Sequence, residues 1–251
     1  MPKLGKKPAR PGAVRLKFSD YATISRLPTP PASFGHGAKV TTAWNMLGND
    51  AYGDCVWAGA AHEHLLWNYE AGVAVPFNEK CVLSDYSAVT GFNPNDPNTD
   101  QGTDMQAAAS YRKKTGILDA HGKRHKVGAY LAIQPGNLDE HLTAAYIFGL
   151  VGLGITFPNT AMDQFNTGHP WDVAAGSQID GGHYIPLISR SAGMSIVLTW
   201  GREQFMTDAF FKANNDESIV YVSTDFLSGG LSPDGFDLEH LNADLAALKP
   251  G

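Results

Sequence analysis

The sequence predicts an α+β protein in which helices come mainly first and antiparallel strands mainly second. A long run with helical periodicity follows Asp54 and ends near Gly72, and its apolar residues cover most sides, as expected of a buried helix. Further along the chain, two strand-like runs at 179–189 and 195–200 are joined by a short turn that contains Gly193, which predicts an antiparallel hairpin. A hydrophobic content of 43% with 18% charged residues is typical of a folded globular chain.

Residues 1–37 are expected to form an extended N-terminal arm. The first 35 residues hold six of the 15 prolines, and residues 1–17 carry six basic and no acidic side chains. This leaves 13 of the 19 basic residues for the rest of the chain, against all 25 acidic ones, so a basic arm precedes an acidic body. Proteins that bind nucleic acids usually carry positive charge on a folded face, so nucleic acid is not expected as a partner.

Turn residues and apolar spacing place the remaining elements. The main domain is expected to span 38–225, with a helical half at about 38–120 and a β half at about 121–225, followed by a C-terminal extension at 226–251 that contains a short helix. The predicted helices are 54–71, 79–92, 104–112, 139–150, 205–212 and 237–248, and the predicted strands are 126–133, 151–157, 179–189, 195–200 and 218–223.

Cys55 is the first candidate for chemistry, because turn-forming residues deliver it to the start of the long helix. Asp54 is a good N-cap, which places Cys55 in the first helical turn. There the helix dipole and unpaired N–H groups favour thiolate, so a lowered pKa is expected. The alternative is a small cysteine packed in the core at a helix start. Cys81 is the only other cysteine, its role is open, and a reducing compartment suits a chain with so few thiols.

His183 is the best candidate for a base that would activate Cys55. It is expected to open a core strand directly after Gly181 and Gly182, whose missing side chains leave room for a substrate or a second backbone. A purely structural histidine is the alternative. The other histidines outside the cysteine helix are expected in loops or on polar faces: His36, His121, His125, His141, His169 and His240.

No metal or other cofactor is expected. His62 and His64 are two residues apart, so they cannot share one helix face as metal ligands, and both are interpreted as ordinary helix residues. The loop at 93–104 is rich in acids and amides, but Gln101 and Ala107 stand where a calcium loop needs Gly and Glu.

These motifs together resemble the papain-like cysteine peptidases over residues 38–225. Asn49 lies six residues before Cys55, where the family has Gln, and Trp57 follows the cysteine closely. His183 follows a glycine, 128 residues downstream of Cys55, and a Trp-Gly pair at Trp200 ends the next strand. The resemblance implies a papain-like fold with a helical half around the helix headed by Cys55 and an antiparallel β half.

The resemblance also implies roles for these residues. Cys55 would be the nucleophile, His183 the base, and Asn49 with the Cys55 N–H would receive the oxyanion. Thr199 or Leu198 stands where the family has the Asn that orients the histidine. The residues of the substrate cleft would be Gly53, Asp54, Trp57, Gly181, Gly182 and Trp200. Too few residues precede Cys55 for the family's inhibitory propeptide, so none is expected.

Two functions follow from these observations. The first is a thiol hydrolase that cleaves a peptide or isopeptide bond of a protein substrate through a Cys55–His183 dyad. The alternative is a weakened or inactive papain-like scaffold in a larger assembly, for example a virion, whose arm contacts neighbouring subunits. The longest apolar run, near 144–151, is too short to span a membrane, and no secretory signal peptide is seen. A location in the cytoplasm or in an assembled particle is therefore expected.

Overall fold

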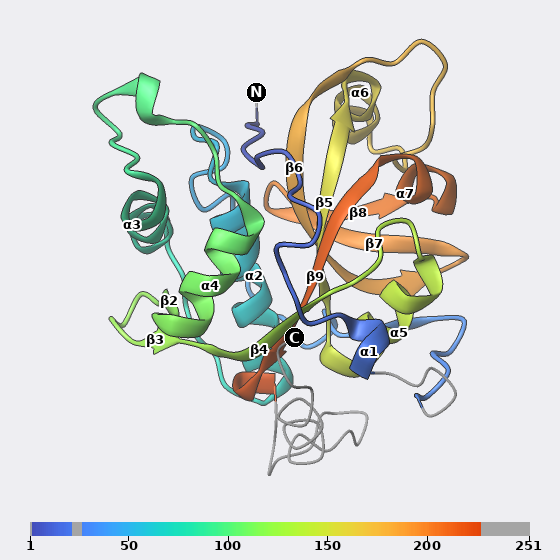
Figure 1. Cartoon of the computed structure of the whole chain (residues 1–251), viewed down its shortest axis with the longest axis horizontal. Helices are drawn as coiled ribbons and strands as arrows, with labels where there is room; N and C mark the ends of the chain where they lie inside the picture. The colour runs from blue at the N-terminus through green and yellow to red at the C-terminus, as the bar shows by residue number, and fades with distance from the viewer. Residues whose placement is uncertain (1, 22–26, 227–251) are drawn as a thin grey trace.

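The computed structural model describes residues 2–21 and 27–226, and the expected helix at 237–248 lies outside them. The chain folds into a helical half and a β half that lie side by side (Figure 1). The helical half is built from α2 (Cys55–Glu70), α3 (Glu79–Thr90) and α4 (Met105–Lys114). One hydrophobic core joins the helical half to the sheet, and a second core joins the sheet to the helices of the β half. The α+β class is confirmed.

α2 is the central helix of the helical half and is buried along almost its whole length, from Cys55 to Asn68. Gly59 allows the helix to approach the sheet closely, since a Cβ there would lie 2.5 Å from the Tyr184 ring. A buried ion pair joins Glu63 of α2 to Arg112 of α4 at 2.5 Å, and the Tyr184 hydroxyl donates to the same carboxylate. These contacts fix α2 against both α4 and the sheet.

The smaller elements of this half begin and end at residues that suit these positions. Asn78 caps α3 by accepting from the Cys81 N–H, and Gly91 ends the helix with a φ of 77°. The Asp104 carboxylate caps α4 by accepting from two backbone N–H groups. A short 3-10 helix, η2 (Pro97–Thr99), precedes α4. After α4 in the sequence, β2 (Ile117–Leu118) pairs with β3 (Arg124–His125).

The β half is an antiparallel sheet in the order β4-β9-β5-β6-β7-β8, with β1 added beside β6. Its strands are β1 (Phe34–Gly35), β4 (Val127–Ala132), β5 (Val151–Pro158), β6 (Ile179–Ser191), β7 (Met194–Thr199), β8 (Arg202–Met206) and β9 (Asn215–Ser223). Three helices pack against this sheet: α5 (Leu138–Phe148), α6 (Asn159–Thr167) and α7 (Asp208–Asn214).

The structure differs from the sequence prediction at α6, which was not predicted, and at 205–212. Phe205 pairs with Ile196 as part of β8, and the helix begins only at Asp208 because Thr207 caps it. The histidines expected in loops or on polar faces are also partly misplaced. His36, His125 and His141 are buried, and hydrogen bonds to their ring nitrogens offset the free-energy cost of removing these polar groups from water.

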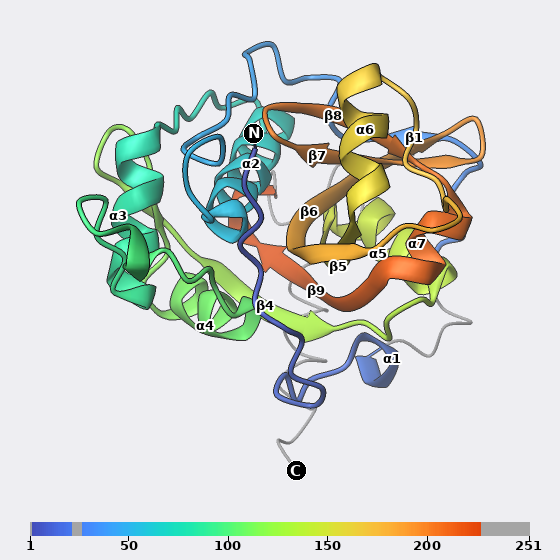
Figure 2. The same ribbon diagram turned by 90° about the horizontal axis from the view of Figure 1, so that it is seen from above.

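The N-terminal arm lies along the boundary between the two halves (Figure 2). After residues 2–10 the chain reaches α1 (Phe18–Tyr21), and at its other end β9 continues into η3 (Thr224–Phe226). None of the helices in the described ranges has the length and apolar character needed to cross a membrane.

Candidate active site

Cys55 is the first residue of α2, as the turn signals before it predict. Leu47 and Gly48 both have positive φ, which turns the chain sharply ahead of the helix. Asp54 occupies the N-cap position, but its side chain makes no capping hydrogen bond. It is fully buried and lies next to Gly48, and burial raises the pKa of its carboxyl group well above the usual value. The expected capping role of this side chain is therefore wrong.

The Cys55 thiol is almost completely buried, with 2% of the residue exposed. Burial raises its pKa to about 12, because a thiolate loses its hydration in the interior. This is opposite to the lowered pKa expected from the helix dipole, since loss of solvent outweighs the dipole here. In this state Cys55 is held as a neutral thiol.

His183 lies within β6 and faces the head of α2. Its Nε2 is 2.8 Å from the Thr199 Oγ, and its ring stacks on Trp200 with 4.4 Å between centroids. Its Nδ1 is buried without a hydrogen-bond partner among the described residues. Burial lowers the pKa of the ring to about 3, so the imidazole is neutral.

Cys55 and His183 both line one small cavity of about 10 Å³. Asn49, Thr199 and Trp200 line the same cavity. Thr199, sixteen residues after His183, is thus the residue whose hydroxyl lies within hydrogen-bond distance of the ring. Leu198 also lines the cavity, but its apolar side chain belongs to the core that joins the helical half to the sheet.

The arm enters this site, and two side chains donate to it. The Asn49 Nδ2 donates to the Lys3 carbonyl oxygen at 3.2 Å and to the Tyr52 carbonyl oxygen at 3.0 Å. The Trp200 Nε1 also donates to the Lys3 carbonyl oxygen, at 3.2 Å. Two side-chain donors that line the same cavity as Cys55 therefore converge on one peptide carbonyl of the arm.

Backbone hydrogen bonds hold the arm in the cleft between the two halves. The N–H groups of Gly5 and Lys6 both donate to the Gly182 carbonyl oxygen, at 3.2 and 3.0 Å. On the opposite wall, the Lys7 N–H donates to the Thr103 carbonyl oxygen at 3.0 Å, and the Thr103 N–H donates to the Gly5 carbonyl oxygen at 2.7 Å. The arm thus bridges the cleft much as an extended peptide ligand would.

Glycines line the path of the arm. A Cβ on Gly5 would lie 1.8 Å from the Gly53 carbonyl oxygen, and one on Gly182 would lie 2.4 Å from the Lys6 carbonyl oxygen. Gly102, which the sequence analysis missed, lies equally close, since a Cβ there would be 2.2 Å from the Gly5 carbonyl oxygen. The Leu4 side chain packs against Gly181. These close approaches leave no space for a second peptide while the arm is in place.

The Lys6 side chain is fully buried beside the cleft and forms an ion pair with Asp216 at 2.9 Å. Gly154 makes room for it, because a Cβ there would lie 2.1 Å from the Lys6 Cε. No local sequence pattern indicates this pair, since its members are 210 residues apart.

Trp57 was expected in the cleft, but it lies in the core of the helical half. Its ring is 1% exposed and packs edge-on against Tyr111. Its Nε1 donates to the Thr103 Oγ at 2.9 Å, so it supports the loop that contacts the arm without lining the cleft itself.

Comparisons with known proteins agree on the fold. No protein-family model and no curated protein sequence matches the chain. Among solved structures, xylellain, a cysteine protease from Xylella fastidiosa, is similar with a TM-score of 0.63 and 11% identity, covering 89% of this chain and 97% of xylellain. Procathepsin B S9 from Trypanosoma congolense gives a TM-score of 0.64 at 10% identity, covering 88% of this chain and 86% of that one.

A third similar structure is digestive procathepsin L 3 from the larval midgut of Tenebrio molitor. Its TM-score is 0.60 at 15% identity, and the match covers 83% of this chain and 74% of that one. At such identities these likenesses establish the architecture alone. The chain has the papain-like fold, with its helical half, its antiparallel β half and a cleft between them.

Proposed function

On this papain-like fold, we propose that the chain is a latent thiol hydrolase of a peptide or isopeptide bond, closed by its own N-terminal arm. The observation that carries the proposal is the position of His183. Thr199 contacts one ring nitrogen, and the other, Nδ1, is buried without a hydrogen-bond partner in the described part of the chain. His183 lines the same cavity as Cys55. An imidazole oriented in this way can take the thiol proton.

The reaction follows from these positions once a substrate replaces the arm. Cys55 Sγ would attack the carbonyl carbon while His183 accepts the thiol proton. The oxyanion would be bound by the Asn49 Nδ2 and by the Cys55 N–H, which as the first residue of α2 has no intrahelical acceptor. His183 would then protonate the leaving amine, and water would hydrolyse the thioester.

The closed arrangement supports latency. With the arm in place, the pKa of Cys55 is near 12 and that of His183 near 3, so neither group is charged at neutral pH. A reactive thiolate–imidazolium pair needs the reverse ionisation of both groups. Displacement of the arm would admit water and substrate together and would move both pKa values back toward their usual range.

The filled cleft also favours the second function, a papain-like scaffold in a larger assembly. Threonine is a weaker partner for the imidazole than a side-chain amide, and the arm occupies the space that a substrate would need. In an assembly the same arm would bind a neighbouring subunit in place of its own cleft, or brace its own fold permanently.

The two functions are separated by labelling with a peptide-like, thiol-directed electrophile near neutral pH. The full chain is compared with a variant that lacks residues 2–9, each with and without Cys55→Ala, and Cys81→Ser serves as the matched control. A hydrolase predicts fast labelling of the shortened chain at Cys55, abolished by Cys55→Ala and unaffected by Cys81→Ser. Labelling that is unchanged by shortening, or carried mostly by Cys81, would contradict the hydrolase. Loss of self-association on shortening would favour the scaffold.

A further inference from the structure

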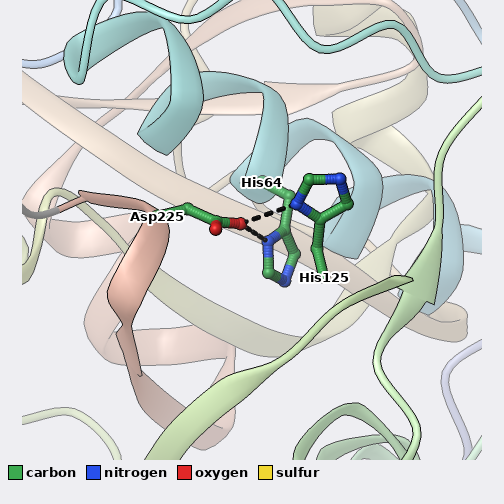
Figure 3. A group of neighbouring side chains, drawn as sticks. All are labelled: His64, His125 and Asp225. Carbon is green, nitrogen blue, oxygen red and sulfur yellow. Dashed lines mark hydrogen bonds and ion pairs between the residues drawn. The ribbon is translucent and has the colours of Figure 1, made fainter. Parts of the chain in front are cut away.

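A second cluster of chemistry-bearing side chains lies away from Cys55, where three distant segments meet. His64 comes from α2, His125 from β3 and Asp225 from η3. Figure 3 shows both rings facing the same carboxylate. The Nδ1 atoms of His64 and His125 lie 3.0 and 2.9 Å from the same oxygen, Asp225 Oδ2. All three potential ligand atoms lie within 4.8 Å of one another.

Two carboxylates contact the buried imidazoles of this cluster. The other ring nitrogen of His125 lies 3.0 Å from Asp119 Oδ2, so one imidazole stands between two carboxylates. Both histidine side chains are fully buried. The buried guanidinium of Arg112 already forms an ion pair with Glu63. Two carboxylates beside buried imidazoles match the charge of one divalent cation.

We propose that His64, His125 and Asp225 bind one divalent transition-metal ion, with zinc as the best fit. Two imidazole nitrogens and one carboxylate oxygen form a ligand set typical of zinc, with the fourth position left for water. Zinc ligands about 2.0–2.2 Å from a tetrahedral ion are roughly 3.3–3.6 Å apart, so small side-chain shifts would convert the observed hydrogen bonds into metal bonds.

Asp119 strengthens this assignment because of where it contacts His125. Imidazoles that bind a metal through one nitrogen usually donate the other N–H to a carboxylate, which fixes the tautomer and ring orientation. The Asp119–His125 contact at 3.0 Å provides this arrangement, with the Nδ1 of His125 directed at the proposed ion.

The proposed ion would have a structural role. It would fix the chain that follows β9 to α2 and β3, and so to the helix headed by Cys55. His64 is nine residues beyond Cys55, which corresponds to about 13 Å along the helix axis, too far for the ion to take part in thiol chemistry. No local sequence spacing predicts this site, because its ligands come from three separate segments.

Metal titration of the full chain tests the proposal. The chain carries Cys55→Ala and Cys81→Ser, which removes both thiols as competing ligands, and is stripped of metal with a chelator. Zinc is then titrated by calorimetry and cobalt(II) by visible absorption. We expect one equivalent of each ion to bind, with cobalt bands of a nitrogen–oxygen site, and at least 100-fold weaker zinc binding in Asp225→Asn and His125→Gln.

Two further variants keep the test decisive if a ligand variant fails to fold. Asp119→Asn leaves all three proposed ligands in place and is expected to weaken zinc binding by about 10- to 100-fold. His121→Gln changes an exposed neighbouring histidine and is expected to have no effect. Substoichiometric binding, or equal zinc affinity in the parent, Asp225→Asn and Asp119→Asn, would show that the cluster is only a hydrogen-bonded network. Because Cys55 is absent from every sample, this outcome is independent of the proposed hydrolase activity.

Discussion

Asp216→Asn is expected to open the cleft by removing the partner of a buried charge. The Lys6 Nζ donates hydrogen bonds to the Asp216 carboxylate and the Lys7 carbonyl oxygen, and its side chain is fully buried. Asparagine keeps the shape of aspartate but not its charge. In the proposed hydrolase the arm leaves the cleft, so the cost of an unpaired ammonium would appear as a larger fraction of molecules with Lys6 in water.

The size of this effect can be worked out from the contacts. Removing one partner of a buried ion pair costs about 3–5 kcal/mol. The lower end applies here, because the Asp216 side chain is 25% exposed and the Glu217 carboxyl also interacts with Lys6. A change of about 3 kcal/mol corresponds to roughly a 150-fold larger open fraction.

The open fraction is measured as the rate at which a small, uncharged thiol reagent labels Cys55 in a Cys81→Ser background, with the labelled site identified by mass spectrometry. Cys55 in Asp216→Asn should be labelled roughly 100 times faster than in the parent. The labelling rate of the chain that lacks residues 2–9 sets the upper limit, because its cleft is always open. Adding Lys6→Met should restore slow labelling, because no buried charge then remains unpaired.

Two outcomes would refute this reasoning. If Asp216→Asn labels as slowly as the parent while the shortened chain labels fast, the arm closes the site but the ion pair does not hold it. If the double variant Lys6→Met with Asp216→Asn stays as open as Asp216→Asn alone, the charge of Lys6 is not the cause.

Three further predictions follow from the same contacts. Gly5→Ala should open the cleft as fully as removal of the arm, because its Cβ would lie 1.8 Å from a carbonyl oxygen, and fast labelling at Cys55 checks this. The closed state should lose up to about 2 kcal/mol of stability relative to the open state as pH falls from 6.5 to 5, because an exposed His183 binds a proton that the buried ring with a pKa of about 3 does not. The closed state should also lose stability above about pH 8.5, because an exposed Cys55 loses a proton that the buried thiol with a pKa of about 12 keeps. Amide hydrogen exchange of Gly5, corrected for its intrinsic pH dependence, measures the loss of the closed state in both pH ranges. Glu63→Gln should lower stability to denaturant by about 3–5 kcal/mol, since Arg112 stays buried without its partner.

Much of the framework could be predicted because it depends on local sequence. The helix headed by Cys55 follows from turn residues, apolar spacing and the glycine that ends it, and all of these lie within one continuous stretch. The hairpin of β6 and β7 follows from two β-rich runs and the turn at Gly193. His183 and Thr199 lie on these two paired strands, so their contact follows from the same hairpin prediction.

Features that depend on burial by distant segments could not be predicted. The predicted lowering of the Cys55 pKa is wrong, because the sequence shows where the helix begins but not which distant segments bury the thiol. Asp54 has the preferred residue type for an N-cap, yet its buried side chain makes no capping hydrogen bond. The pairing of Lys6 with Asp216 joins segments that are 210 residues apart, and no local pattern indicates such a contact.

The arm links the site to both proposed functions, because catalysis and closure require opposite environments for the same two groups. A thiolate and an imidazolium need water or mutual contact, whereas the covered cleft keeps Cys55 and His183 neutral. Residues 3–7 make backbone hydrogen bonds to both walls and bury a lysine, so their removal must expose the cleft even if the rest of the fold is unchanged. The two functions therefore differ in where the arm goes. A hydrolase requires it to leave and a peptide to take its place, whereas a scaffold requires it to stay or to bind a neighbouring subunit.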